Sequence, residues 1–167
     1  MTGGPWGRLV RHGDGSGVSL EFVRTLPTSP DRVWAALTEP EATARWIGSW
    51  TGDPATGAVA LYMEGADPAG PGESMVIRTC RPPHLLEIAG DSPDGVWPLS
   101  IELGNLSGAT VLTFRHRLAA PVDVSSIGPG WHYYLDRLAA VVAGTPVPDD
   151  WDATFPARAE WYRGLTC

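Results

Sequence analysis

The chain has 167 residues, of which 43% are hydrophobic, and a formal net charge of -7. These values are typical of one globular domain and argue against a nucleic-acid-binding protein, which needs a basic surface. All twelve basic residues are arginines, and the absence of lysine excludes a P-loop, whose motif ends in GK[ST], and Schiff-base catalysis.

The sequence carries no signal for a membrane span, a secretory leader or a metal site. It has no run of about 18 apolar residues and no basic segment followed by an apolar one at its start. Cys80 and Cys167 do not have the spacing of a metal-ligand pair, and the four histidines are not paired as in zinc sites. We therefore expect a cytoplasmic protein without metal or other cofactor, which binds neither membranes nor nucleic acids.

A hairpin and two short helices are predicted first. Residues 8–26 read as two extended segments around a turn rich in Gly and Asp. We assign residues 1–17 to an N-terminal segment that contributes at most a short hairpin strand. Ser29 and Pro30 are typical of a helix start, as N-cap and first helical residue. A second short helix restarts near Pro40.

Five strands are predicted between about residue 57 and residue 118. Runs of apolar residues alternate there with turn sequences, and connections this short favour antiparallel neighbours. In the last strand, His116 shares one face with apolar side chains, while Arg115 and Arg117 lie on the other, solvated face. The strand before it has a matching apolar set: Trp97, Leu99, Ile101 and Leu103. The sheet therefore has one apolar face that another element must cover.

A long helix supplies that cover. It is predicted to begin near Gly130, after the interruption at Gly128 and Pro129, and to end at Gly144. Its apolar stripe consists of Trp131, Tyr134, Leu135, Leu138 and Val142. His132 and Asp136 form an i,i+4 pair on its flank, and Tyr133 and Arg137 form another on the solvent side. A last short helix is expected near the C-terminus, with Thr154 as N-cap and Pro156 at its first position.

The order of these elements predicts an α+β fold. A curved antiparallel sheet of about six strands wraps around the long C-terminal helix, and two short helices follow the first strand. Residues 18–144 form this domain, and residues 145–167 form a C-terminal extension whose short helix packs on it.

Four stretches of the sequence together resemble a known group. They are RTLPTSPDRVWAALTEPEATARWIG (24–48), RPPHLLEI (81–88), TVLTFRHRL (110–118) and GWHYYLDRLAAVV (130–142). They resemble the START-like or SRPBCC superfamily, and within it the domain related to activators of the heat-shock protein 90 ATPase. The resemblance implies a helix-grip fold with a cavity between sheet and long helix. In relatives this cavity binds small hydrophobic or amphipathic molecules, and in a minority of them it performs cyclase or dehydratase chemistry.

The residues expected to border such a cavity are aromatic and aliphatic side chains of the sheet and the long helix. They are Trp131, Tyr134, Leu138, Phe114, His116, Trp97, Ile101 and Trp46. Trp131 and Tyr134 either fill the core or line the cavity wall. Trp46, like Trp50, either flanks the cavity entrance or packs under the helix pair.

Two titratable residues remain ambiguous. His116 is either a structural histidine or the group that orients a ligand or exchanges protons with it. Glu87 faces solvent if Leu86 and Ile88 face inward, and faces the cavity in the opposite strand phase. No convincing acid/base pair emerges.

Three functions are compatible with these features. The first is non-enzymatic binding of a small hydrophobic or amphipathic molecule in the cavity. The second, implied by the resemblance alone, is activation of a chaperone ATPase of the heat-shock protein 90 type through the protein surface. The third is a small cyclase or dehydratase that uses His116, with Tyr134 or Glu87 as its partner. The sequence is compatible with a monomer or a homodimer.

Overall fold

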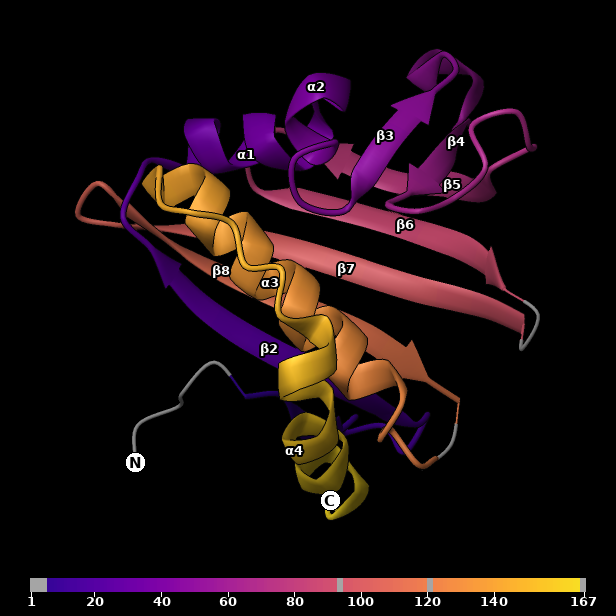
Figure 1. Ribbon diagram of the computed structural model, residues 1–167, viewed down its shortest axis with the longest axis vertical. Coiled ribbons are helices and arrows are strands. Elements are labelled where there is room, and N and C mark those ends of the chain that lie inside the picture. The colour runs from indigo at the N-terminus through magenta and orange to yellow at the C-terminus, as the bar shows by residue number, and fades with distance from the viewer. Residues whose placement is uncertain (1–5, 93–94, 120–121, 166–167) are drawn as a thin grey trace.

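The computed structural model describes residues 6–92, 95–119 and 122–165 of the chain. In chain order, the elements are β1 (Arg8–Arg11), β2 (Val18–Leu26), α1 (Pro30–Thr38), α2 (Pro40–Thr43), β3 (Gly48–Thr51), the 3-10 turn η1 (Pro54–Thr56), β4 (Ala58–Met63), β5 (Glu73–Arg81), β6 (Leu85–Ser92), β7 (Gly95–Leu106), β8 (Ala109–Leu118), α3 (Ile127–Ala143) and α4 (Trp151–Arg163). Figure 1 shows one sheet with α3 laid across one of its faces.

The sheet has eight strands in the order β1-β2-β8-β7-β6-β5-β4-β3, and every neighbouring pair is antiparallel. The predicted α+β helix-grip fold is confirmed, but the predicted number of about six strands is too low. The shortest strands, β1 and β3, have four residues each. Segments this short leave little room for the alternation from which strands are recognised.

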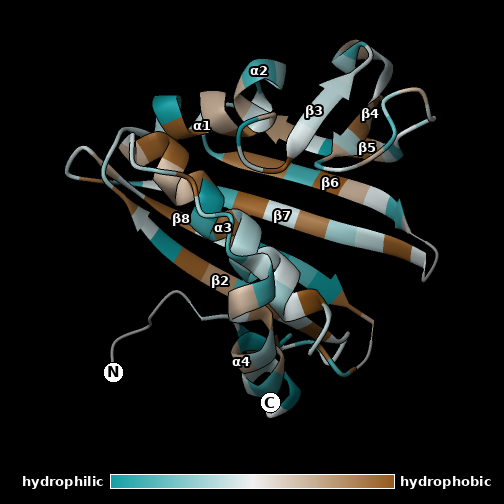
Figure 2. Ribbon diagram, viewed as in Figure 1, coloured by the Kyte–Doolittle hydropathy of each residue, from teal (hydrophilic) through white to brown (hydrophobic). Residues whose placement is uncertain are grey.

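The core lies between the sheet and α3. Apolar and polar residues alternate along the central strands, visible as brown bands along β6 and β7 in Figure 2, so one face of the sheet is apolar. Leu20 and Phe22 on β2 are fully buried, as is Leu112 on β8. Helix α3 packs against these residues and contributes Leu135 and Leu138 to the core, which are 3% and 1% exposed. We call the face on which α3 lies the concave face.

Helix α3 begins three residues earlier than the predicted start at Gly130. It runs from Ile127 and includes Gly128 and Pro129, so the predicted interruption is wrong. Pro129 is tolerated because the first-turn N–H groups of a helix have no intrahelical partner to lose. Gly128 is required for a different reason: an added Cβ would lie 2.3 Å from Cγ of Tyr162 on α4.

Helix α4 also differs from the prediction. It begins at Trp151, with Asp150 and not Thr154 as N-cap, and Pro156 lies inside it. A proline at this position removes one backbone hydrogen bond. Tertiary packing outweighs that loss, because Tyr162 and Ala159 of α4 are 1% and 5% exposed and α4 packs against α3.

Two glycines in the first turns of α3 give a matched test of this packing. We predict that Gly128→Ala lowers the free energy of unfolding by about 1–3 kcal/mol, because its methyl group overlaps the Tyr162 ring. Gly130→Ala should instead be neutral or stabilise by up to about 1 kcal/mol, because its Cβ meets nothing within 4 Å and alanine favours the helix. Urea unfolding of both variants checks this, and equal effects would contradict the close contact between α3 and α4.

Candidate ligand-binding site

Strand register assigns each side chain to the concave or the outer face. Leu86 and Ile88 on β6 pair with Ile101 and Leu99 on β7, which pair with Phe114 and His116 on β8. Side chains that pair directly across antiparallel strands lie on the same face. The pairings also place β4 residues on this face. Val59 pairs with Met75 on β5, Met75 pairs with Gly90 on β6, and Gly90 pairs with Trp97 on β7. Val59, and Leu61 two residues further along β4, therefore lie on the same face as Trp97.

The concave face is only half covered. Figure 1 shows α3 lying over β2, β8 and β7, with β4 and β5 to one side. Under α3 the side chains are buried, whereas beyond it several apolar ones are only partly buried against the core. These are Val59, Leu61 and Met63 of β4, Leu86 and Ile88 of β6, and Trp131 and Tyr134 of α3. We call these seven side chains, together with the half-buried Trp97, the apolar wall.

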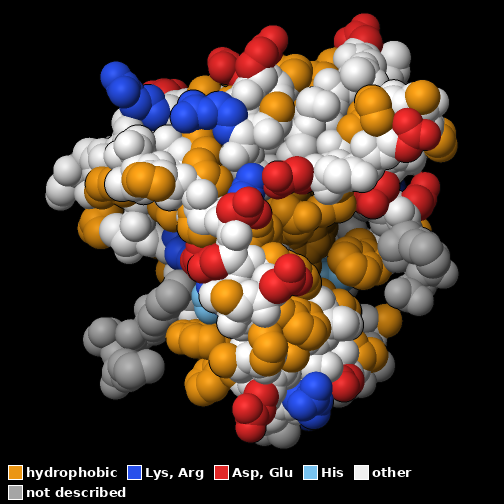
Figure 3. All heavy atoms as spheres, viewed as in Figure 1, with side chains coloured by type: hydrophobic (Ala, Val, Ile, Leu, Met, Phe, Trp, Pro, Cys, Tyr) orange, Lys and Arg blue, Asp and Glu red, His pale blue; other side chains and the backbone are white. Residues whose placement is uncertain are grey.

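A hollow opens beside α3 at this side of the molecule. Figure 3 shows hydrophobic side chains at the bottom of a depression whose rim carries acidic groups. A recess of about 270 Å³ there is lined by Glu64, Gly130, Tyr133, Tyr134, Asp149 and Trp151. Tyr134 belongs both to this recess and to the apolar wall, so the two adjoin at this residue.

Aromatic rings hold the N-terminal half of α3 on the sheet. The Trp131 ring lies 4.7 Å from Phe114 and 6.2 Å from Trp97, measured between ring centroids. The Trp131 indole N–H donates a hydrogen bond to Nδ1 of His116 at 3.2 Å, and Trp97 lies 4.7 Å from the same imidazole. These contacts join α3, β7 and β8 at the edge of the apolar wall.

His116 is buried, with 2% of its surface exposed. Burial lowers its pKa to about 4, so the imidazole is neutral at neutral pH, and because Nδ1 accepts from Trp131 its proton lies on Nε2. Glu87 cannot act as its acid/base partner, since it pairs with Ser100 on the outer face. Among the described residues, the Trp131 indole is the single hydrogen-bond partner of the His116 imidazole. The geometry therefore gives His116 a positioning role toward Trp131.

The remaining cavity residues named from the sequence divide into two groups. Leu138, Phe114 and Ile101 are 1%, 3% and 7% exposed and belong to the packed core. Trp46 is also buried, and its indole N–H donates to the carbonyl of Ala36 at 2.8 Å. Trp97, Trp131 and Tyr134, by contrast, lie where the core is incompletely covered.

The prediction that Tyr133 and Arg137 face solvent is wrong, because both are 7% exposed. The chain that follows α3 folds back over this flank. Arg137 donates to the carbonyls of Trp46 and Pro148 and to the Tyr133 hydroxyl, and it forms a 2.8 Å ion pair with Glu64. No local sequence signal indicates this burial, because the partners of Arg137 come from separate parts of the chain: Trp46 after α2, Glu64 after β4 and Pro148 before α4.

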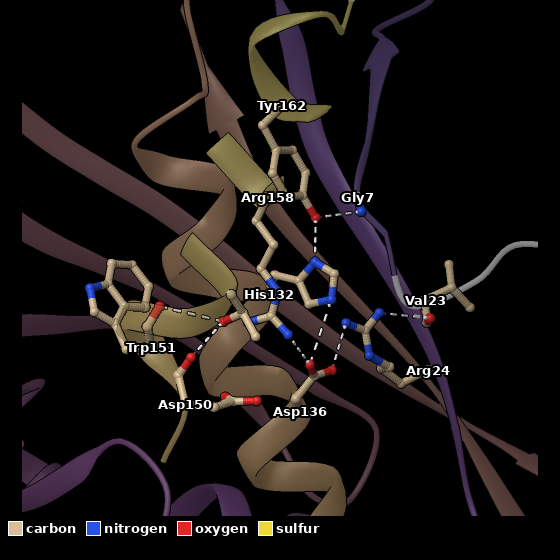
Figure 4. Close-up of polar contacts among 10 residues, drawn as sticks. Gly7, Val23, Arg24, His132, Asp136, Asp150, Trp151, Arg158 and Tyr162 are labelled. Carbon is tan, nitrogen blue, oxygen red and sulfur yellow. Dashed lines mark hydrogen bonds and ion pairs between the residues drawn. The ribbon is translucent and has the colours of Figure 1, made fainter. Parts of the chain in front are cut away.

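A second buried polar cluster joins α3 to α4 (Figure 4). The Asp136 carboxylate receives hydrogen bonds from Arg158 at 2.9 Å and from Arg24 at 3.4 Å. The Tyr162 hydroxyl accepts from the Gly7 N–H at 2.8 Å and is 3.0 Å from Nδ1 of His132. Burial lowers the pKa of His132 to about 3 and raises that of Tyr162. The cluster ties the N-terminal segment, β2, α3 and α4 together, which is a structural role.

The outer face of the sheet has a hollow of its own, of about 460 Å³. Its lining combines polar side chains, among them Glu87, Arg115 and Arg117, with apolar residues such as Val96 and Pro98. Arg115 already forms ion pairs there with Glu21 and Glu102.

Within the described part of the chain, no group of three or more His, Cys, Asp or Glu residues could hold a metal ion. In the same residues, no helix is long and apolar enough to cross a membrane.

The two buried histidines predict a pH dependence of stability. Each stays neutral when folded, with a pKa of about 4 for His116 and about 3 for His132, and binds a proton near pH 6.5 once unfolded. Between pH 6.5 and 4 the unfolded chain thus holds more protons, so the free energy of unfolding falls as pH falls, by up to about 1.4 kcal/mol per pH unit for each histidine.

His116→Gln should remove one histidine's share of that slope, and His132→Gln should remove the other. Urea unfolding at pH 6.5, 5.5 and 4.5 measures both slopes. An unaltered slope in His116→Gln would show that His116 is not held neutral by burial.

Similar solved structures share the fold over most or nearly all of the chain. The crystal structure of CalU16 from Micromonospora echinospora superposes with a TM-score of 0.76 at 22% identity, covering 99% of this chain and 98% of that one. The protein encoded by gene BPP1335 from Bordetella parapertussis gives 0.68 at 25% identity, covering 99% and 97%. DynU16, described as a protein in the dynemicin biosynthetic locus, gives 0.63 at 22% identity, covering 77% and 48%.

No functionally curated protein shows significant sequence similarity to the chain. A family model does match: residues 27–143 fit the model described as activator of Hsp90 ATPase homolog 1-like protein. The match begins at the residue after β2, ends at the last residue of α3 and so includes the strands and the helix that form the apolar wall. The chain belongs to the family of activator of Hsp90 ATPase homolog 1-like proteins.

Proposed function

We propose that the protein binds a small apolar or amphipathic molecule on the uncovered half of the concave face, beside α3. The observation that carries this proposal is the apolar wall. Its side chains come from α3 and from the face of β4, β6 and β7 on which α3 lies. They remain partly exposed, whereas the same face under α3 is buried. Apolar surface that stays exposed in a concave position is typical of ligand sites.

The physical driving force is the removal of this wall from water. Covering about 300 Å² of apolar surface contributes roughly 7 kcal/mol, before the entropic cost of association is subtracted. A ligand of that size is therefore expected to bind with a Kd in the millimolar range. The residual polar groups at the wall, such as the Tyr134 hydroxyl, would orient it.

A structural neighbour supports a small-molecule ligand. DynU16 belongs to a biosynthetic locus according to its description, which associates this fold with small-molecule metabolism. We propose binding without chemical conversion, because an acid/base reaction would need a second titratable group beside His116. Among the described residues its only hydrogen-bond partner is an indole N–H.

Two neighbouring residues of β6 provide the test. Leu86 pairs with Ile101 on the concave face, and Leu85 pairs with Glu102 on the outer face; both are half-buried. We predict that the fluorescent probe N-phenyl-1-naphthylamine binds the protein and that Leu86→Gln weakens its affinity about ten-fold, equivalent to about 1.4 kcal/mol. Leu85→Gln should leave the affinity unchanged.

Fluorescence titration of the three proteins measures these affinities, and native mass spectrometry of freshly purified protein shows whether a molecule co-purifies. Equal affinities in Leu86→Gln and Leu85→Gln would place the probe elsewhere. Absence of saturable binding would contradict the proposed function.

A further inference from the structure

The recess beside α3 combines aromatic rings with carboxylates. Tyr133 stands between two rings, with centroids 5.5 Å from Tyr134 and 5.4 Å from Trp151. Glu64 and Asp149 complete the side-chain lining. The three rings come from two segments, α3 and the start of α4, and only the fold brings them together.

The charge in this recess is predominantly negative. Within the described chain, the Asp149 carboxylate forms no hydrogen bond or ion pair. The negative charges of Glu64 and Glu73 also contribute to raising the pKa of Tyr134, together with its burial, which is the larger cause.

The guanidinium of Arg137, which is bonded to Glu64 and Tyr133 of the recess, has most of its donors engaged. It donates to Glu64, the Tyr133 hydroxyl and the carbonyls of Trp46 and Pro148, and it lies 5.3 Å from the centre of the Tyr133 ring. Little donor capacity remains for an anionic ligand.

We propose that this recess binds an organic ammonium group, and that the ligand of the concave face is therefore a cationic amphiphile. The inference rests on the proposed function, because the recess meets the apolar wall at Tyr134. Aromatic faces attract alkylammonium groups through the ring quadrupole, and the carboxylates add direct attraction. A recess of about 270 Å³ accommodates a head group, while the alkyl or ring portion lies along the wall.

The chemistry of the lining favours an organic cation over a metal ion. Hard divalent cations are held mainly by carboxylates, and within the described residues no group of three or more His, Cys, Asp or Glu could hold a metal ion. One carboxylate, Glu64, is already paired with Arg137. An alkylated ammonium needs no such coordination sphere and gains from contact with the rings.

Gly130 offers a way to close the recess without disturbing the fold. It lines the recess, and a side chain there would meet no atom within 4 Å of its Cβ. Gly130→Leu is expected to fold and to fill the recess with its side chain. Asp149→Asn removes the unpaired carboxylate, and Asp152→Asn is its control, because Asp152 is exposed on α4 and does not line the recess.

Choline and its uncharged isostere 3,3-dimethylbutan-1-ol differ in charge at nearly equal shape, so they isolate the cation. We expect choline to bind about ten-fold more tightly, as measured by titration in ¹H–¹⁵N NMR spectra. Asp149→Asn should weaken choline binding about three-fold, Gly130→Leu should abolish it, and Asp152→Asn should leave it unchanged.

The same variants are titrated with N-phenyl-1-naphthylamine to separate the two proposals. Probe binding without any preference for choline over its isostere would overturn the ammonium site and leave the apolar wall as the ligand site. Choline binding that is equal in wild type, Asp149→Asn and Gly130→Leu would also overturn it, by placing the cation elsewhere. A preference for choline that both recess variants reduce supports the site, even if the apolar probe does not bind.

Discussion

One long helix is too narrow to cover one face of an eight-stranded sheet, and most of the protein's properties depend on this mismatch. Strands about 4.8 Å apart make a sheet of eight about 33 Å wide, whereas a helix with its side chains is about 10–12 Å across. Helix α3 covers β2, β8 and β7. On β4 and β6, apolar side chains remain partly exposed, and these form the wall to which we assign ligand binding.

The C-terminal extension determines which part of the concave face remains open. Tyr162 packs against Gly128, and Arg158 reaches Asp136, so α4 closes one flank of α3. The chain leading into α4 lies over Arg137, which bonds to the carbonyl of Pro148. These contacts bury the polar flank of α3 and leave Trp131 and Tyr134, on its apolar stripe, at the open side. The same extension brings Asp149 and Trp151 to the mouth of the site.

Local sequence patterns predicted the fold class, the apolar faces of β7 and β8 and the start of α1, because these depend on neighbours two to four residues apart. The phase of β6 around Glu87 stayed open, and the pairing of Glu87 with Ser100 places it on the outer face. The burial of Arg137 and Tyr133 was missed, since it depends on a segment that returns from residues 146–150. The prediction that α3 starts at Gly130 is wrong because glycine and proline usually mark helix boundaries. Here Gly128 allows close contact with Tyr162, and Pro129 lies in the first turn of the helix. The recess itself had no sequence signal, because Glu64, Tyr133 and Asp149 meet only in the folded chain.

The most direct test of the half-covered concave face is a methyl ¹H–¹³C NMR spectrum recorded under xenon pressure, because xenon occupies accessible apolar sites without needing polar contacts. Shifts should concentrate on the methyl groups of Leu61, Met63, Leu86 and Ile88, and should be small for Leu20 and Leu112, which are fully buried. Shifts spread evenly over the core, or confined to the outer face at Val96, would contradict an apolar site beside α3.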